Sequence, residues 1–204
     1  MPTTADLFVR CLEAEGVPCM LGVPGEENAD FMMSLEGSSI RMINTRHEQG
    51  AAFAAAAYGR LTGEPLAVLA TLGPGATNLL TGVADANMDH APVLAITGQG
   101  STDRLHKESH QIMDVVSMFE PVTKWATSIR SSKAVPETIR KAIRICRGGK
   151  PGAVLIELPE DTAGPAATGS PLQPNRYRRP VPGAPLLAAA CGVLASSNAP
   201  RVAP

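Results

Sequence analysis

Short apolar runs alternate along the chain with longer segments in which apolar residues recur at helical spacing. Runs of about five to seven apolar residues are typical of strands that are buried on both faces. Their alternation with helices predicts a three-layer α/β sandwich, in which a mostly parallel sheet of about six strands is flanked by helices. The candidate strands cover residues 17–23, 40–44, 66–71, 93–97, 122–126 and 153–158.

The segments between these runs carry helix signals. Thr3 and Asp6 form a candidate capping pair at the start of the first helix, and Gly16 is a candidate stop. Pro136 stands where a later helix can begin. The predicted helices cover residues 3–15, 48–61, 76–88, 114–118, 136–147 and 186–194.

Ligands of parallel sheets bind outside the carboxyl ends of the strands. That rule selects three places in this chain, which are Pro24-Gly25, residues 45–48 and residues 73–78. We therefore expect any functional site to be built from these three segments.

The composition changes after Asp161. Residues 162–185 are rich in Pro, Gly, Ala and Arg and have almost no periodicity, which is typical of an extended linker. A single helix after that linker cannot bury a core of its own. The sequence predicts a domain over residues 1–161, a linker over residues 162–185 and the truncated start of a central domain over residues 186–204.

Charge and hydropathy argue against nucleic acid and membranes as binding partners. The formal net charge of -1 gives no electrostatic reason to expect nucleic acid or an anionic membrane as a partner. No apolar run approaches the roughly 18–20 residues that span a bilayer, and residues 1–6 do not resemble a signal peptide, so we expect a cytoplasmic protein. The four cysteines are scattered without a Cys-x-x-Cys pair, which favours reduced thiols over a zinc site.

The motif Gly73-Pro74-Gly75-Ala76-Thr77-Asn78 follows a predicted strand and opens a helix. Glycines at such a turn let a ligand approach the backbone, and a helix N-terminus favours anions. A dinucleotide site is disfavoured, because Asn78 replaces the third glycine and no acidic residue ends the next strand. A tight turn with no ligand explains the motif equally well.

Glu48 begins the alanine-rich helix that follows a predicted strand. Acidic residues are common at helix N-termini because they favour the macrodipole, so a structural role is a strong alternative. A carboxyl group held against the small residues of this helix is expected to be desolvated, which favours its protonated form. A carboxyl that can donate a hydrogen bond at neutral pH has a catalytic property that structure does not require.

The motifs of this chain occur in the order found in the acetolactate synthase family of thiamine-diphosphate enzymes, which the chain resembles. The resemblance runs from about Ala5 to Asp161, and seven motifs in sequence make chance a poor explanation. The first four are Gly22-Val23-Pro24-Gly25, Arg46-His47-Glu48-Gln49-Gly50-Ala51-Ala52, Gly73-Pro74-Gly75-Ala76-Thr77-Asn78-Leu79, and Met88-Asp89 with Ala91-Pro92-Val93 and Ile96-Thr97-Gly98-Gln99. The others are His110-Gln111, Pro121-Val122-Thr123-Lys124-Trp125 and Gly149-Lys150-Pro151-Gly152-Ala153-Val154.

The resemblance implies a role for this domain in holding the aminopyrimidine ring of thiamine diphosphate. Glu48 matches the glutamate that hydrogen-bonds the ring nitrogen N1′ and so promotes activation of thiazolium C2 for attack on pyruvate. Val23 and Gly25 match the loop near the ring, and Pro74 and Asn78 match the stretch against it.

Two further residues carry less specific matches. Gln111 matches a glutamine near the reacting centre, although its neighbours differ from the commonest family pattern, and with Glu48 it completes the expected catalytic pair. Lys124 matches a lysine near the substrate channel, but a solvated surface lysine is the stronger interpretation. His47 beside Glu48 is interpreted as a structural histidine rather than a base.

Family members bind the diphosphate through Mg²⁺ with a Gly-Asp-Gly motif, which this chain lacks. The resemblance therefore implies a diphosphate-binding domain outside this chain, Mg²⁺ bound there, and FAD as an optional component of the full enzyme. It also implies a homodimer or homotetramer formed through this domain. We expect the chain alone to be inactive.

Three functions remain open at this point. The chain is part of an acetolactate synthase that converts pyruvate to 2-acetolactate in the branched-chain amino acid or acetoin route, or the pyrimidine-domain subunit of a two-chain 2-keto acid decarboxylase, or a non-catalytic fold remnant. Pyruvate is the preferred substrate, with benzoylformate, glyoxylate and oxalyl-CoA as alternatives, because the fold is shared by enzymes of several 2-keto acids.

Overall fold

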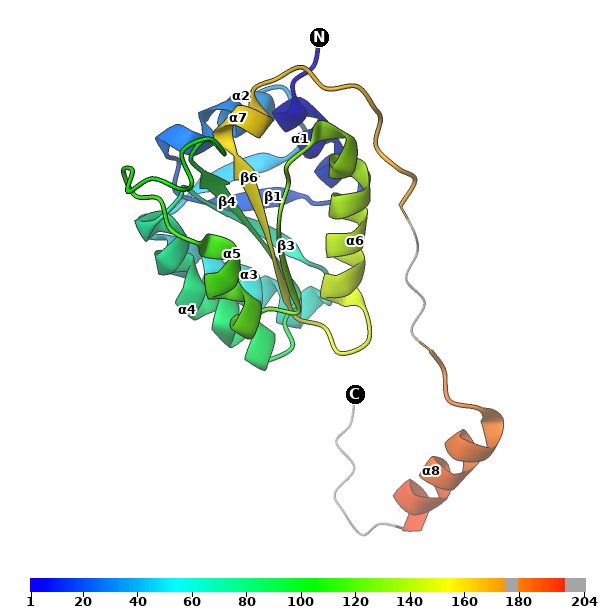
Figure 1. The fold of residues 1–204 in the computed structure, drawn as a ribbon. Coiled ribbons are helices and arrows are strands. Elements are labelled where there is room, and N and C mark those ends of the chain that lie inside the picture. Colours follow the sequence, from blue (N-terminus) through cyan, green and yellow to red (C-terminus); the bar gives the residue numbers. More distant parts are fainter. Residues whose placement is uncertain (175–179, 197–204) are drawn as a thin grey trace.

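Six strands form one sheet in the computed structural model, which describes residues 1–174 and 180–196. Every neighbouring pair of strands is parallel, and the strand order is β2-β1-β3-β4-β6-β5 (Figure 1). This confirms the predicted three-layer sandwich with a parallel sheet. The strands are β1 (Cys19–Gly22), β2 (Arg41–Asn44), β3 (Leu66–Ala70), β4 (Val93–Gln99), β5 (Trp125–Ser128) and β6 (Ala153–Pro159).

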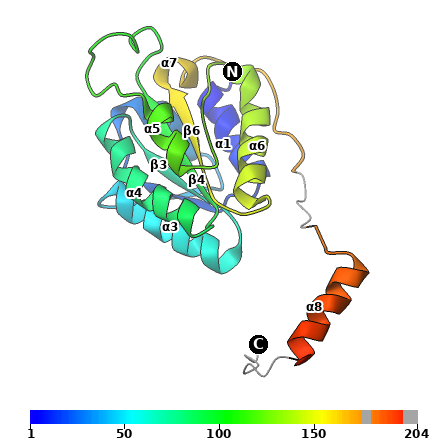
Figure 2. The same cartoon turned by 60° about the horizontal axis from the view of Figure 1, so that its bottom comes forward.

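Helices cover both faces of this sheet and enclose two apolar cores. One core lies beneath α1, α2 and α6, and the other lies beneath α3, α4 and α5 (Figures 1 and 2). The helices are α1 (Thr4–Ala14), α2 (Ala29–Leu35), α3 (Glu48–Thr62), α4 (Pro74–Met88), α5 (Val115–Phe119), α6 (Val135–Arg147), α7 (Glu160–Ala163) and α8 (Ala184–Ser196). The short 3₁₀ turns are η1 (Glu26–Asn28), η2 (Glu120–Val122) and η3 (Ser132–Ala134).

The strands differ in burial according to their place in the sheet. Every residue of β3, β4 and β6 is buried, as expected for central strands that read as continuous apolar runs. The edge strands β2 and β5 have no buried residue. The strand predicted over residues 122–126 begins later, at Trp125, because Pro121 and Val122 belong to the turn η2.

The first helix begins as its sequence predicts. The Thr3 hydroxyl accepts a hydrogen bond from the Asp6 backbone N–H, and the Asp6 carboxylate accepts one from the Thr3 N–H. This capping box satisfies two backbone donors at the start of α1. Two short helices, α2 and α7, are not predicted by the sequence pattern, and α2 buries only Phe31 and Leu35.

The order of the strands creates a switch point between β1 and β3. The chain leaves β1 through α2 to reach β2 on one side, whereas it leaves β3 through α4 to reach β4 on the other side. Helices α2 and α4 lie on opposite faces of the sheet. A crevice is expected outside the carboxyl ends of strands at such a point.

The C-terminal part of the chain differs from the sheet domain. Residues 163 and 167 are buried, and the Pro165 carbonyl accepts a hydrogen bond from the Thr4 N–H at the start of α1. In contrast, every residue of α8 is exposed, and the helix lies apart from the sheet in both views (Figures 1 and 2). The predicted linker and final segment include residues 175–179 and 197–204, which lie outside the described residues, and the proposed domain division remains a prediction.

None of the helices within residues 1–174 and 180–196 is both long enough and apolar enough to cross a lipid bilayer.

Candidate functional site

The three segments selected by the strand-end rule meet at one edge of the sheet. Val23 to Gly25 follows β1, residues 45–48 follow β2, and residues 71–78 follow β3. These are the strands on both sides of the switch point, so the segments surround the expected crevice.

Glu48 and Asn78 lie side by side at this edge. Glu48 is the first residue of α3, and only 8% of its surface is exposed. The Asn78 amide nitrogen on α4 donates a hydrogen bond of 3.0 Å to Oε2 of Glu48. One carboxyl oxygen is thus fixed by a protein donor.

The other carboxyl oxygen lies close to Gly75, where there is no room for a side chain. A Cβ atom added to Gly75 would lie 3.3 Å from Oε1 of Glu48 and 2.9 Å from Cγ2 of Thr71. A Cβ atom added to Gly25 would lie 2.4 Å from Cβ of Thr71. The two glycines therefore let the Thr71 side chain pack closely against both segments, and Gly75 is itself buried beside the Glu48 carboxyl.

The turn before α4 brings Gln111 to the same region. Gly73 has a φ of 51°, in the left-handed region that favours glycine, and Pro74 occupies the first turn of α4. A Cβ atom on Gly73 would lie 2.3 Å from the Gln111 backbone oxygen. Gln111 itself has a φ of 57°, which is uncommon for a residue with a side chain. The structure thus brings the Gln111 backbone next to the motif that contains Asn78.

Hydrogen bonds fix the loop after β1. The Val23 N–H donates to the Leu69 carbonyl at 3.2 Å, and the Gly25 N–H donates to Oδ1 of Asn28 at 3.0 Å. Asn28 is buried, so the loop that carries Val23 and Gly25 is held from beneath by a side chain of η1.

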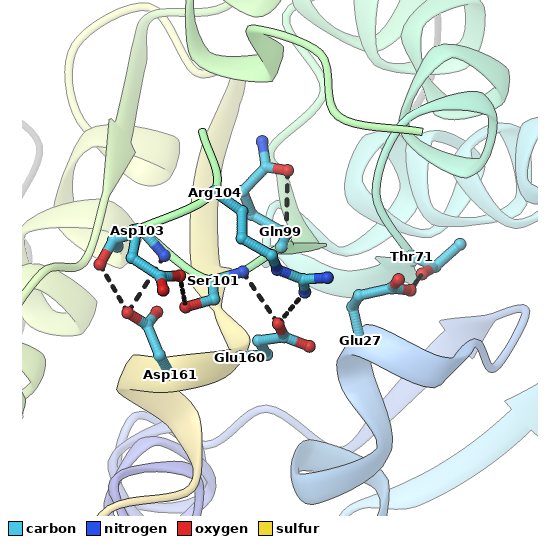
Figure 3. Close-up of polar contacts among 10 residues, drawn as sticks. Glu27, Thr71, Gln99, Ser101, Asp103, Arg104, Glu160 and Asp161 are labelled. Carbon is cyan, nitrogen blue, oxygen red and sulfur yellow. Dashed lines mark hydrogen bonds and ion pairs between the residues drawn. The ribbon is translucent and has the colours of Figure 1, made fainter. Parts of the chain in front are cut away.

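Two residues at this edge are not predicted as site residues from the sequence. The Thr71 hydroxyl donates a hydrogen bond of 2.9 Å to Oε2 of Glu27, and this pair joins the loop after β1 to the end of β3 (Figure 3). The apolar pattern makes Thr71 only the last residue of a predicted strand. The signal that could have found it is its place directly before the Gly73 motif. Glu27 gives no signal, because it lies in a 3₁₀ turn with no apolar pattern.

Other candidate residues lie away from this edge. Lys124 precedes β5, so it stands at the opposite edge of the parallel sheet, where its Nζ donates to the Ile145 and Gly148 carbonyls. His47 caps α3, and its Nδ1 accepts a hydrogen bond from the Gln49 N–H, in agreement with a structural role. Within the part of the chain that the structure describes, no cluster of three His, Cys, Asp or Glu residues could hold a metal ion.

A second buried carboxyl lies at the end of β6. Glu157 is 4% exposed, and its Oε2 accepts a hydrogen bond of 2.9 Å from the Gln99 amide on β4. Burial raises the pKa of the Glu157 carboxyl, and hydrogen bonds from Ser128 and Gln99 oppose that rise. Glu157 is a charged residue within the strand predicted over residues 153–158, and its hydrogen bond with Gln99 is not predicted from the sequence.

Replacing Glu157 with glutamine is expected to change how stability depends on pH. Because the folded-state pKa is raised, Glu157 contributes stability that is fully present below the unfolded value of about 4.5 and is lost as the pH rises through the folded pKa. The free energy of unfolding of the wild type should therefore fall relative to that of Glu157→Gln as the pH rises from about 4.5 to about 8. Urea unfolding at a series of pH values measures this difference.

Glu120→Gln is the matched control, since Glu120 is an exposed residue of η2. Its difference from the wild type should stay constant over the same pH range. A constant difference for Glu157→Gln as well would contradict the prediction.

The family comparison agrees with this geometry. Residues 2–118 match the model of the family described as "Thiamine pyrophosphate enzyme, N-terminal TPP binding domain". This match covers the capping box of α1, the loop after β1, Glu48 and the motif from Gly73 to Asn78.

Curated relatives match most of the chain. It is 45% identical over 172 residues to the catabolic acetolactate synthase of Raoultella terrigena, covering 84% of this chain and 31% of that protein. It is 43% identical over 157 residues to a probable acetolactate synthase large subunit of Methanocaldococcus jannaschii, covering 77% of this chain and 27% of that protein. It is 42% identical over 158 residues to the acetolactate synthase of Bacillus subtilis, covering 77% of this chain and 28% of that protein.

The chain spans about three tenths of the length of these relatives. The family match, the parallel sheet with its switch point, and the buried glutamate at the start of α3 lead to one conclusion. This chain belongs to the family of N-terminal thiamine pyrophosphate-binding domains of thiamine pyrophosphate enzymes.

Proposed function

We propose that this chain binds the aminopyrimidine ring of thiamine diphosphate in an acetolactate synthase. The observation that carries the proposal is the buried Glu48 carboxyl, with one oxygen held by Asn78 and the other above Gly75. The carboxyl offers a hydrogen-bonding partner to a ring nitrogen, and the glycines keep the segments around it close together. The residues present therefore fit the aminopyrimidine group.

Each site residue receives a role under this proposal. Glu48 would form a hydrogen bond with ring nitrogen N1′, and Asn78 keeps the Glu48 carboxyl oriented. The loop of Val23 and Gly25 and the stretch that contains Pro74 would hold the ring, and Gln111 would lie near the reacting centre. When bound, thiamine diphosphate supplies the carbon nucleophile that adds to a 2-keto acid.

The substrate proposal rests on the relatives. The three relatives from Raoultella terrigena, Methanocaldococcus jannaschii and Bacillus subtilis are called acetolactate synthases. We therefore propose pyruvate as the substrate and 2-acetolactate as the product, in the branched-chain amino acid or acetoin route. Under this proposal Glu48 controls the protonation of the cofactor ring, whereas residues outside this chain select the substrate.

The diphosphate needs a further binding site. This chain contains no Gly-Asp-Gly motif. We propose that a diphosphate-binding half holds Mg²⁺ and the phosphates, that FAD is an optional component of the full enzyme, and that copies of this domain assemble in a homodimer or homotetramer. The reconstituted enzyme is this chain together with the diphosphate-binding half, which is supplied by a longer polypeptide or by a partner chain.

Product analysis tests the proposal. The reconstituted enzyme should consume pyruvate and release 2-acetolactate only when thiamine diphosphate and Mg²⁺ are present. A blot of the source cells against this domain identifies the arrangement, since a band much larger than 204 residues means one long polypeptide and a band of this size means a separate partner. No cofactor-dependent turnover of pyruvate would refute the acetolactate synthase proposal.

The purified 204-residue chain is expected to bind thiamine diphosphate weakly. Charge-assisted hydrogen bonds and metal contacts to the diphosphate are worth roughly 1.5–3 kcal/mol each, and the chain lacks the motif that makes them. Calorimetry should give a Kd at least about a hundredfold higher than that of the reconstituted enzyme. Equal affinities would show that the chain contains a diphosphate site of its own.

A further inference from the structure

Residues 100–113 form a loop between β4 and α5 that ends at the candidate site. No side chain between residues 101 and 113 is buried. The Gln111 backbone oxygen nevertheless approaches Gly73 so closely that a Cβ atom there would lie only 2.3 Å away. The position of this exposed loop therefore determines how Gln111 meets the turn before α4.

Apolar packing does not hold this loop in place. A cleft of about 760 Å³ separates it from the edge of the sheet, with Leu105 and Ile112 on the loop side and Ser128 and Glu157 on the sheet side. A loop above an open cleft needs other contacts to keep one position. Backbone hydrogen bonds stabilise turns within the loop, and the side-chain contacts that join it to β4 and α7 are polar and lie near its two ends.

Two carboxylates of α7 hold the start of the loop (Figure 3). Oε1 of Glu160 accepts a hydrogen bond of 3.0 Å from the Ser101 N–H and also pairs with the Arg104 guanidinium. Oδ2 of Asp161 accepts hydrogen bonds from the Thr102 N–H at 3.1 Å and from the Thr102 hydroxyl at 2.5 Å. Both carboxylates bind backbone donors, so they fix the course of the chain and not only a side chain.

The Gln99 side chain joins both ends of the loop. Its oxygen accepts a hydrogen bond of 3.0 Å from the Gly100 N–H, and its nitrogen donates one of 2.9 Å to the Met113 carbonyl. The same nitrogen donates to the buried Glu157 carboxyl, which ties the amide to β6. Gln99 thus joins Gly100 at the start of the loop to Met113 at its end, two residues after Gln111.

The backbone of Gln111 shows that the loop is constrained. Its φ of 57° lies in the left-handed region that residues with a side chain adopt only when their surroundings hold them. The turn closed by the hydrogen bond from the Ile112 N–H to the Ser109 carbonyl, the contact with Gly73 and the anchors at the two loop ends constrain this segment. Loss of the anchors should allow Gln111 to return to an ordinary backbone conformation.

We propose that Glu160, Asp161 and Gln99 are positioning residues, which hold the loop of residues 100–113 so that Gln111 stays at the cofactor site. The role in catalysis rests on the proposed function, whereas the anchoring itself concerns this chain alone. Glu160 and Asp161 lie on α7, and neither the family comparison nor the site geometry assigns them a function. They act through Gln111 and not on the substrate.

Hydrogen–deuterium exchange on this chain tests the anchoring. In the double variant Glu160→Ala, Asp161→Ala, amide exchange in residues 100–113 should be at least about tenfold faster, because several charge-assisted hydrogen bonds are lost. Exchange in α3 and α4 should not change. Asp103→Ala is the matched control, since Asp103 accepts a hydrogen bond from Ser101 within the same loop, and it should leave exchange near the wild-type rate.

Kinetics of the reconstituted enzyme test the positioning. The double alanine variant should lower kcat by about 10- to 100-fold, since a displacement of about 1 Å in a reacting group costs that much. KM for pyruvate should change much less. The pair Glu160→Gln, Asp161→Asn keeps the acceptor oxygens and should recover most of the lost kcat, and Asp103→Ala should leave kcat unchanged.

The outcomes separate this proposal from the proposed function. Faster loop exchange together with a lower kcat that the amide variants recover supports it. Unchanged loop exchange, unchanged kcat, or faster exchange throughout the sheet overturns it. An inactive wild-type reconstituted enzyme refutes the proposed function instead, and the exchange experiment then still decides whether the anchors hold the loop.

Discussion

Glu48→Gln should lower kcat of the reconstituted enzyme by about 10²–10⁴-fold, the usual contribution of a positioned acid or base. Glutamine keeps an oxygen that can accept the hydrogen bond from Asn78, so the side chain can retain its place. It cannot pass a proton to or from a ring nitrogen in the space above Gly75. The measurements are pyruvate turnover and the rate at which the cofactor's thiazolium C2 proton exchanges with solvent.

Two controls make this result specific to Glu48. The free energy of unfolding of Glu48→Gln should remain close to that of the wild type, because no packing atoms are lost. Glu120→Gln changes an exposed carboxylate at the other edge of the sheet and should leave kcat unchanged. Wild-type proton exchange in Glu48→Gln would rule out a catalytic role and favour a fold that has kept the glutamate for structural reasons.

The second large effect concerns folding. In Gly22→Ala, the added Cβ would lie 2.0 Å from the Leu69 carbonyl oxygen and 2.8 Å from its carbon. These atoms are backbone atoms of β3, the strand that pairs with β1, so the clash cannot be relieved by a side-chain rotation. Overpacking commonly costs about 1–3 kcal/mol, and we expect at least about 3 kcal/mol here, a large part of a typical stability of about 5–15 kcal/mol. Urea unfolding of the purified chain measures the loss.

Gly50→Ala is the matched control for this substitution. Gly50 lies exposed in α3, and a Cβ atom there meets no other atom within 4 Å. Alanine in a helix is favoured over glycine by roughly 0.5–1 kcal/mol, so the same change should raise stability at this position. Similar midpoints for the two variants would mean that β1 and β3 approach each other less closely than described.

The central part of the fold could be predicted because burial leaves a clear pattern there. Strands β3, β4 and β6 are buried throughout, and each contains a run of at least four consecutive apolar residues. Short elements give no such signal. Helix α2 buries two residues and α7 one, and their positions depend on contacts with distant segments. Val122 and Thr123 resemble strand residues, but Val122 belongs to the turn η2 (Glu120–Val122), so strand β5 begins later than predicted.

The location of the candidate site could be predicted from the topology of a parallel sheet. Parallel strands end at one edge, so Glu48 and Asn78 could be expected near each other, and the structure adds the hydrogen bond between them. The contacts of Thr71 with Glu27 and of Gln99 with Glu157 could not be predicted. Each joins residues 44 to 58 positions apart, and pairing over such distances depends on the order of the strands in the sheet.

The strand order also has a consequence for synthesis on the ribosome. Strand β5 is made before β6 but pairs only with β6, which lies between β4 and β5. Until residues 153–159 have emerged, β4 presents an unpaired edge and β5 has no neighbour. Unpaired edges invite association with other chains. The nascent domain is therefore most prone to aggregation during the interval between the completion of β4 and the insertion of β6, and a nascent-chain chaperone would protect it most effectively in that interval.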